Sequence, residues 1–494
     1  MNYISTRNSE IKVTASQAIA QGISKDGGLF VPETIPTLKN EDYNALKNMN
    51  YVERAAFVLK LFLTDFTDEE IKYCVEGAYK GTFDNDLPAP LNTINDNTHI
   101  LELWHGPTCA FKDLALQLLP YLLTTSAKKV SGGKETVILV ATSGDTGKAA
   151  LEGFCDVENT KIMVFYPSNG VSKMQKLQMD TQKGENVLVC SINGNFDDAQ
   201  TGVKKIFTDK RVNELLEKNN MQFSSANSIN WGRLAPQIIY YVSAYCDLLA
   251  KGENIENGFN VVVPTGNFGN ILAAYYAKAM GVPINKLICA SNANNVLTDF
   301  IKTGVYNRNR NFYTTISPSM DILISSNLER MLFEASERNS ALTASLQNDL
   351  ATKGEYRISD ELHAKFESLF FGGCCDDAKT KATIKKYFDE LGYLSDTHTA
   401  VALAVFEEYK EKTGDTRPTV IASTASPYKF ADSVIEAIGE SVSDSDFDTV
   451  KKLSKITNTA IPTPISALEN AVPRFNNLCE KQEMEEFVLK NLKI

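Results

Sequence analysis

The chain has 494 residues, 43% hydrophobic and 22% charged, which is the composition of a folded protein of two or three domains. A formal net charge of -11 without any basic cluster argues against a nucleic-acid partner. The longest apolar stretch, residues 234–250, contains Pro236, Gln237 and Asp247, so we expect a buried helix there and no membrane span. The N-terminal residues lack the apolar core of a secretory signal, and the nine cysteines show no metal-type pairing. We therefore expect reduced thiols, no metal site and a cytoplasmic location.

The first 90 residues are predicted to be mostly helical after a short opening. Thr67 followed by Glu70 is a capping-box pattern, and apolar residues then recur at helical spacing. Pro88 and Pro90 each disfavour helix in the residue before them. We therefore expect an N-terminal domain over residues 1–90, followed by a second region over 91–494.

Short runs rich in Val and Ile characterise the region after residue 90. They cover residues 136–141, 161–166, 186–192, 260–263, 287–290 and 418–422, with helical patterns between most of them. Strands that are apolar throughout and alternate with helices predict an α/β fold whose parallel sheet is covered on both faces. Residues from about 296 to 412 are predicted to be mainly helical, with a loop at 371–373.

The segment from Trp104 to Asp113 contains Lys112 just before a predicted helix. The partial positive charge at a helix N-terminus disfavours an ammonium group and favours the neutral amine. A neutral amine is what a Schiff-base lysine needs for carbonyl chemistry and proton abstraction. By residue type alone, a solvated surface lysine is the more common interpretation.

Two strand-to-helix turns are rich in glycine and polar residues. The turn after strand 136–141 offers backbone N–H groups for a carboxylate or phosphate, although an ordinary βα turn is an equal alternative; it contributes Ser143, Gly144, Asp145 and Thr146. The turn after strand 260–263 has glycines at spacing three that let the backbone wrap an anion; it contributes Gly266, Asn267, Phe268, Gly269 and Asn270. It lacks both G-x-G-x-x-G and a P-loop lysine, so the phosphate of a small cofactor fits better than a dinucleotide or a nucleoside triphosphate.

Two further segments are weaker signals when taken singly. Thr424 follows strand 418–422, where α/β sheets bind ligands. Residues 227–233 supply amide, hydroxyl and guanidinium donors for a phosphate or carboxylate, or form a polar helix-entry loop; the candidates are Asn227, Ser228, Asn230 and Arg233.

Taken together and in this order, these motifs resemble the threonine synthases, within the tryptophan-synthase-beta-like class (fold type II) of enzymes that use pyridoxal 5'-phosphate (PLP). Residues 3–7 (YISTR) and 26–32 (DGGLFVP) resemble the N-terminal domain of that family specifically, and residues 396–400 (DTHTA) resemble another family segment. The sequence departs from the family pattern S-T-A-H-P-A-K-F at Ser426 and Tyr428, and Thr397 replaces a proline.

The resemblance implies a fold and a set of roles. Residues 91–494 would form the catalytic region, with two α/β subdomains and a helical insertion around 331–390. Lys112 would hold PLP and move protons, residues 266–270 would bind the cofactor phosphate, and Thr424 would meet the pyridine nitrogen. Residues 143–146 would face the substrate, residues 228, 230 and 233 would bind its phosphate, and Asn227 would also bind the substrate. Asp145 would accept a hydrogen bond or be protonated.

The implied reaction converts O-phospho-L-homoserine and water to L-threonine and phosphate, in a monomer or homodimer. Two alternatives remain: another fold type II lyase, such as a threonine dehydratase or cysteine synthase, and a PLP-binding protein that has lost catalysis. The N-terminal segment argues against the first alternative, and the intact Lys112 argues against the second.

Overall fold

Two sheets form the halves of the molecule in the computed structural model, which describes residues 1–142, 144–169 and 171–494. The larger sheet has six strands in the order β14-β11-β10-β15-β5-β4, and only β4 runs antiparallel to its neighbour. The strands are β4 (Leu91–Asn95), β5 (Thr98–Glu102), β10 (Phe259–Pro264), β11 (Ile284–Ser291), β14 (Phe370–Cys374) and β15 (Thr419–Ser423).

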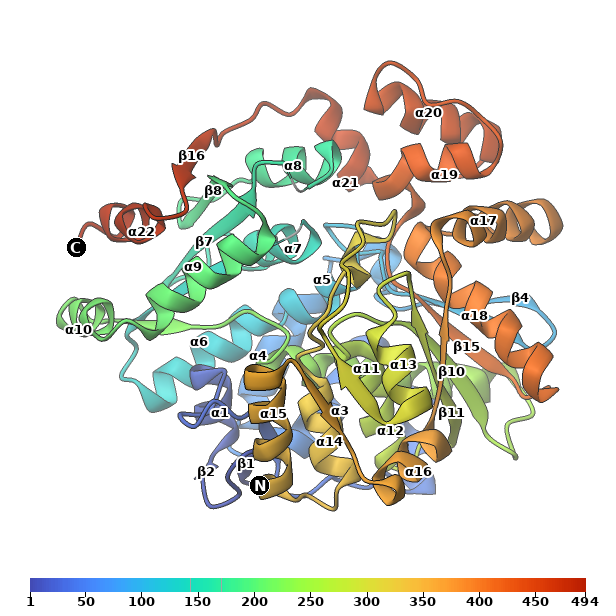
Figure 1. Cartoon of the computed structure of the whole chain (residues 1–494), viewed down its shortest axis with the longest axis horizontal. Coiled ribbons are helices and arrows are strands. Elements are labelled where there is room, and N and C mark those ends of the chain that lie inside the picture. Colours follow the sequence, from blue (N-terminus) through green and yellow to red (C-terminus); the bar gives the residue numbers. More distant parts are fainter. Residues whose placement is uncertain (143, 170) are drawn as a thin grey trace.

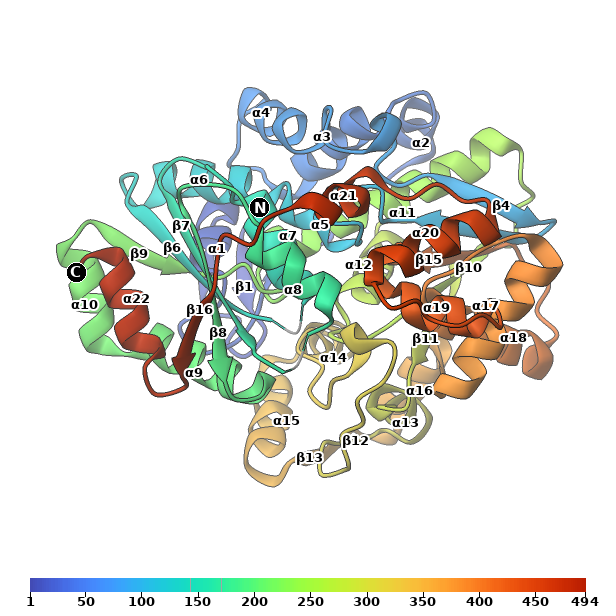
Figure 2. The same ribbon diagram turned by 90° about the horizontal axis from the view of Figure 1, so that it is seen from above.

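The smaller sheet has five parallel strands in the order β16-β8-β7-β6-β9. They are β6 (Glu135–Ala141), β7 (Thr160–Pro167), β8 (Val187–Asn193), β9 (Met221–Ser224) and β16 (Asn477–Glu480). The six strands predicted from apolar runs are all confirmed, whereas β4, β5, β9, β14 and β16 were not predicted. The two sheets lie side by side, and the C-terminal segment crosses from the six-stranded half to add β16 to the other (Figures 1 and 2).

Helices cover both faces of each sheet, as the apolar strands require. In β10, Val261 and Val263 pack toward α11 (Trp231–Lys251) and α12 (Gly269–Ala279), while Val262 packs toward α18 (Thr397–Thr413). In the five-stranded half, the helices are α5 (Lys112–Leu116), α6 (Leu119–Val130), α7 (Asp145–Gly153), α8 (Lys173–Asp180), α9 (Phe196–Thr208), α10 (Lys210–Lys218) and α22 (Met484–Leu492). The other half also contains α13 (Val296–Thr303), α17 (Asp377–Leu391), α19 (Ala431–Ala437), α20 (Asp446–Thr457) and α21 (Thr463–Ser466).

Helices are the main regular elements of the first 90 residues, as predicted, although they cover fewer than half of these residues. A three-stranded antiparallel sheet of β1 (Tyr3–Ser5), β2 (Lys12–Val13) and β3 (Phe30–Pro32) accompanies α1 (Ala15–Gln21), α2 (Asn40–Leu46), α3 (Tyr51–Phe62) and α4 (Asp68–Tyr79). The capping box of Thr67 and Glu70 begins α4. These elements share one apolar core with α11, so the N-terminal segment supports the helix that carries Arg233.

The prediction of a loop at residues 371–373 is wrong, because these residues belong to strand β14. A Cβ on Gly372 would lie 3.2 Å from Thr298 Cα, and one on Gly373 would lie 2.5 Å from Val405 Cγ1. The two glycines therefore allow α13 and α18 to approach the edge strand closely. The rest of the predicted insertion is helical, with α14 (Leu328–Ala335), α15 (Ser340–Lys353), α16 (Asp360–Leu369) and α17, together with a small hairpin of β12 (Val305–Asn307) and β13 (Glu355–Arg357).

Residues 234–250 lie within α11 and are mostly buried, as expected. None of the helices in the described ranges is both long and apolar enough to cross a membrane.

Candidate active site

Lys112 is the first residue of α5, a helix that lies between the two sheets in Figure 2. Its side chain is only 11% exposed, and its Nζ lies 3.7 Å from Asp145 Oδ2 and 3.4 Å from Ser319 Oγ. The preceding loop is fixed by Asp113, whose carboxylate accepts from the backbone N–H and the hydroxyl of Thr108. Lys112 is therefore not a solvated lysine.

Asp145 begins α7 at the end of strand β6. Thr142 shapes this turn, because its hydroxyl accepts from the backbone N–H groups of Gly144 (3.0 Å) and Gly147 (2.9 Å). Gly144 has a φ of 135°, which side chains rarely tolerate. Thr146 is half-buried beside it, and the predicted site residue Ser143 lies outside the described residues.

The Asp145 carboxylate accepts from Lys429 Nζ (2.7 Å), Gln175 Nε2 (3.0 Å) and Ser319 Oγ (3.2 Å). Burial alone would raise its pKa, but Lys429 and Lys112 outweigh burial and hold the pKa of Asp145 well below its ordinary value. This arrangement supports an ionised Asp145 that accepts hydrogen bonds, not the protonated alternative.

The charges around Lys112 favour its neutral amine. Burial lowers the pKa of Lys112, and the nearby cations Lys429 and Arg233 lower it further against the opposing effect of Asp145. Burial and two neighbouring cations thus lower the pKa of Lys112 in the same direction as the helix terminus considered from the sequence.

The glycine-rich turn of residues 266–270 joins β10 to α12 and is an open anion cradle. Phe268, in the left-handed conformation with φ 62°, precedes α12 without a side-chain cap. Among the described residues, the backbone N–H groups of 266–270 have no hydrogen-bond partner. Asn270 Oδ1 accepts from the hydroxyls of Tyr240 and Tyr241, which leaves its buried Nδ2 without a partner. Unpaired donors at a helix N-terminus fit a phosphate group.

Strand β15 brings Thr424 to the Lys112 loop. The Thr424 carbonyl accepts from Phe111 N at 2.9 Å, and Thr424 is 5% exposed. The two departures from the family pattern bond elsewhere: Ser426 N donates to Cys109 O, and the Tyr428 hydroxyl lies 2.9 Å from Thr459 O. Lys429, fully buried, follows them and reaches Asp145.

Arg233 lies in the first turn of α11. It donates to Ala226 O. Among the described residues, its buried Nε has no partner, and no carboxylate lies within ion-pair distance. Burial lowers the pKa of Arg233 to about 10, so the guanidinium is still a cation at neutral pH. A buried cation with an unpaired donor is prepared for an anion.

The other candidates near Arg233 divide into two groups. Ser228 accepts from Asn327 Nδ2 (3.3 Å), which also donates to Asn267 O (3.1 Å), so Ser228 is linked to the glycine-rich turn. Asn230 is different: its Nδ2 donates to Ile19 O and Ser225 O, and its Oδ1 caps α11 at Gly232 N. Because its polar atoms are used within the fold, we remove Asn230 from the ligand-binding candidates. Asn227 is exposed.

Four residues near the site were not predicted as site residues: Lys429, Ser319, Gln175 and Asn327. Ser319 lies in the 3-10 turn η2 (Pro318–Met320), and Asn327 precedes α14. They come from segments without a motif, so their position depends on the tertiary fold. Lys429 could have been selected, because it belongs to the segment after Thr424.

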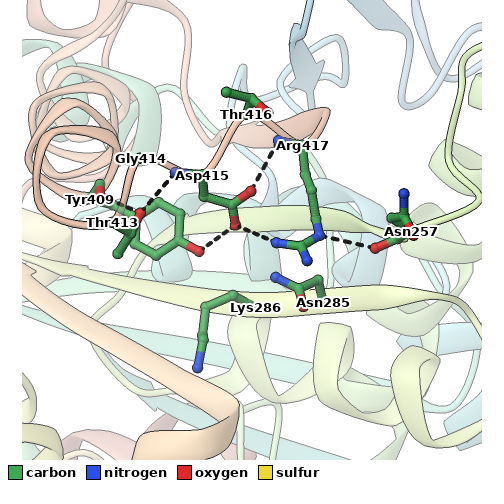
Figure 3. A pocket seen from close by; sticks show the side chains of 9 residues that line it. All are labelled: Asn257, Asn285, Lys286, Tyr409, Thr413, Gly414, Asp415, Thr416 and Arg417. Carbon is green, nitrogen blue, oxygen red and sulfur yellow. Dashed lines mark hydrogen bonds and ion pairs between the residues drawn. The ribbon is translucent and has the colours of Figure 1, made fainter.

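A surface cavity of about 560 Å³ lies at the opposite end of the six-stranded sheet, before β10, β11 and β15 (Figure 3). Its charged groups already have partners within the fold: Arg417 and Asp415 pair with each other, and Lys286 Nζ donates to the backbone carbonyls of Glu367 and Ser368. Arg417 Nη1 lies 3.0 Å from Asp415 Oδ2, which also accepts from the Tyr409 hydroxyl at 2.7 Å. The Lys112 cluster, with its unpaired donors, is therefore the better candidate for a ligand site.

Three family models match the chain. "Threonine synthase N terminus" matches residues 2–79, "Pyridoxal-phosphate dependent enzyme" matches 87–351, and "Threonine synthase, C-terminal" matches 399–488. Among curated relatives, human Threonine synthase-like 1 is 42% identical over 88% of this chain, and the matched part is 60% of that protein's length. Threonine synthase of Pseudomonas aeruginosa is 38% identical over 88% of this chain and 90% of its own.

The same likeness extends to solved structures. The crystal structure of PLP-bound threonine synthase from Brucella melitensis is similar with a TM-score of 0.89 and 37% identity, covering 100% of both chains. Yeast threonine synthase gives a TM-score of 0.88 and 32% identity, covering 100% of this chain and 99% of the other.

Proposed function

Because this chain belongs to the threonine synthase family of pyridoxal-phosphate-dependent enzymes, we propose that it converts O-phospho-L-homoserine and water to L-threonine and phosphate. The observation that carries the proposal is a buried lysine beside an open phosphate cradle and a second, unpaired cation. Lys112, the 266–270 turn and Arg233 supply these three parts.

The described residues fit PLP. The free N–H groups of residues 266–270 and Asn270 Nδ2 would hold its phosphate, and the Lys112 amine would bind its carbonyl carbon. The Thr424 hydroxyl, which has no hydrogen-bond partner among the described side chains, would meet the pyridine nitrogen. When bound, PLP serves as the electron sink for carbanion chemistry at the substrate.

The substrate phosphate would occupy a second anion site. Arg233 would bind it, since no described carboxylate competes for this cation, and Ser228 from the same segment is a further candidate ligand. Gly144 and Thr146, with Ser143, would face the substrate carboxylate at the N-terminus of α7. Lys112 Nζ, whose pKa is lowered by burial and its cationic neighbours, would take and return the protons at Cα and Cβ.

Release of phosphate distinguishes this function from that of other fold type II lyases. The purified protein should release phosphate and form L-threonine from O-phospho-L-homoserine, and it should act poorly on L-threonine or O-acetyl-L-serine. Deamination of L-threonine without phosphate release would favour the dehydratase alternative. Bound cofactor without turnover of any of these amino acids would favour the non-catalytic alternative.

The nine cysteines, all free thiols here, fit the expected cytoplasmic location.

A further inference from the structure

Ser319 lies between the amine of Lys112 and the carboxylate of Asp145. Its Oγ is 3.4 Å from Lys112 Nζ and 3.2 Å from Asp145 Oδ2, whereas the amine and the carboxylate are 3.7 Å apart, too far for a hydrogen bond. An ammonium only donates and an ionised carboxylate only accepts. The hydroxyl therefore accepts from Lys112 and donates to Asp145.

Building on the proposed function, we propose that Ser319 is a spacer residue, whose hydroxyl orients the Lys112 amine and prevents a direct hydrogen bond between that amine and Asp145. A direct hydrogen bond to the carboxylate would keep the proton on Lys112, and a protonated amine neither attacks a carbonyl nor removes a proton. The charged groups that face the amine are Asp145, Lys429 and Arg233. Ser319 thus weakens the one interaction among them that would hold Lys112 in its charged form.

His398 is the residue that positions Ser319. Ser319 N donates to His398 Nε2 at 3.1 Å, so this nitrogen carries no proton, and Nδ1–H donates to Asp396 Oδ2 at 2.8 Å. Asp396 is itself fixed as the N-cap of α18, and the buried ring of His398 packs against Phe430. The charged groups facing the imidazole are Asp396 and Asp321. Through this contact, the DTHTA segment of residues 396–400 would position Ser319.

The turn that carries Ser319 is also held from the side of the glycine-rich turn. A Cβ on Gly266 would lie 2.8 Å from the carbonyl oxygen of Ser319. Asp321 adds a further anchor, because its carboxylate accepts from Asn292, Asn294 and Thr315. The hydroxyl is therefore presented by a fixed backbone, as a spacer requires.

The test follows the capture of PLP by the cofactor-free full-length chain between pH 6 and 10, with the adduct reduced by borohydride and quantified at Lys112 by peptide mass. In Ser319→Ala the amine can approach Asp145 directly, so the pH midpoint of capture should move about one unit to the alkaline side, and capture at neutral pH should slow about tenfold. Ser319→Thr keeps the hydroxyl and should keep the wild-type midpoint. Thr314→Ala, on the exposed part of the same segment, is the control.

Substitutions of His398 separate positioning from general damage to the fold. His398→Phe keeps the ring but loses the acceptor, and it should move the midpoint in the same direction as Ser319→Ala. His398→Gln offers an amide oxygen to Ser319 N, and its pH midpoint should therefore lie close to the wild-type value. An unchanged or acid-shifted midpoint in Ser319→Ala would overturn the inference, while failure of the wild-type chain to capture PLP at Lys112 would instead overturn the proposed function.

Discussion

Arg233 is a buried cation that lacks a carboxylate partner among the described residues, so a bound anion would stabilise its charge. In Arg233→Met, kcat/KM for O-phospho-L-homoserine should fall by an amount that corresponds to about 2–5 kcal/mol of lost transition-state binding. The reason is that a desolvated charge contact with the substrate phosphate is lost. Removing an uncompensated buried charge should leave thermal stability equal or higher. Steady-state kinetics and a melting curve of the same variant test both parts. Unchanged kcat/KM would exclude Arg233 from substrate binding.

Lys429 and Asp145 form a buried ion pair, with side chains 0% and 4% exposed. Lys429→Met should lower the free energy of unfolding by about 3–5 kcal/mol at neutral pH, because Asp145 loses its closest cation. Since the native pKa of Asp145 is lowered, the unfolded chain binds more protons below about pH 4, and the contribution of the pair should decline there. Urea unfolding at several pH values, with Asp145→Asn and the double variant, measures the coupling. Additive losses in the double variant would show that the two residues do not interact.

The glycine-rich turn of residues 266–270 needs a glycine at the point where the backbone of Ser319 comes close to it. Gly266→Ala places a methyl group 2.8 Å from Ser319 O and should weaken PLP binding about tenfold or more, because the turn and Ser319 must move apart. Gly269→Ala is the matched variant, since its Cβ would meet only atoms at 3.5 Å and beyond. Its effect on the PLP dissociation constant, measured by cofactor titration, should be much smaller. Equal losses in both variants would contradict the steric explanation.

Glycine also explains where prediction of elements from the sequence succeeded and failed. Gly266 and Gly269 follow a strand of Val residues, so periodicity and turn chemistry together indicated a βα turn. Gly372 and Gly373 looked like a loop for the same reason, yet they lie in β14, where α13 and α18 leave no room for side chains. The local sequence does not show that neighbouring helices exclude side chains at these two positions.

At the scale of the molecule, Arg330 links the N-terminal segment to the site. Its guanidinium donates to Phe30 O (3.0 Å), Asn327 Oδ1 and Ile229 O (both 2.6 Å), and Asn327 in turn bonds Asn267 O. Arg330→Leu should lower the free energy of unfolding by about 3 kcal/mol or more, because two buried acceptors and one part-buried acceptor lose their donor. It should also weaken PLP binding.

The exposed pair of Lys365 and Glu337 provides the control for Arg330. Lys365→Ala should change the free energy of unfolding by less than about 1 kcal/mol, because a solvated pair contributes little. Denaturant unfolding and cofactor titration measure both effects. A stable Arg330→Leu variant with normal PLP affinity would mean that the N-terminal segment does not support the site.

The sequence predicted the class of fold, and its motifs supplied several candidate residues that the fold brings together, because each motif directly follows a strand of a parallel sheet and such strand ends converge. It did not predict Ser319, Gln175 and Asn327, which reach the site from segments without a motif. It also included Asn230, a plausible donor whose polar atoms are consumed by the cap of α11 and by Ile19 and Ser225. Residue type indicates what a side chain can bind, while the fold decides which partners it already has.

The most direct test of the account is phosphate release by the cofactor-loaded protein and its Lys112→Ala variant. We predict that the wild-type protein releases phosphate from O-phospho-L-homoserine with equimolar L-threonine, and that borohydride fixes the cofactor to Lys112. The folded Lys112→Ala variant should show neither covalent cofactor nor turnover. Full turnover by the variant, or by a wild-type protein free of cofactor, would contradict the account.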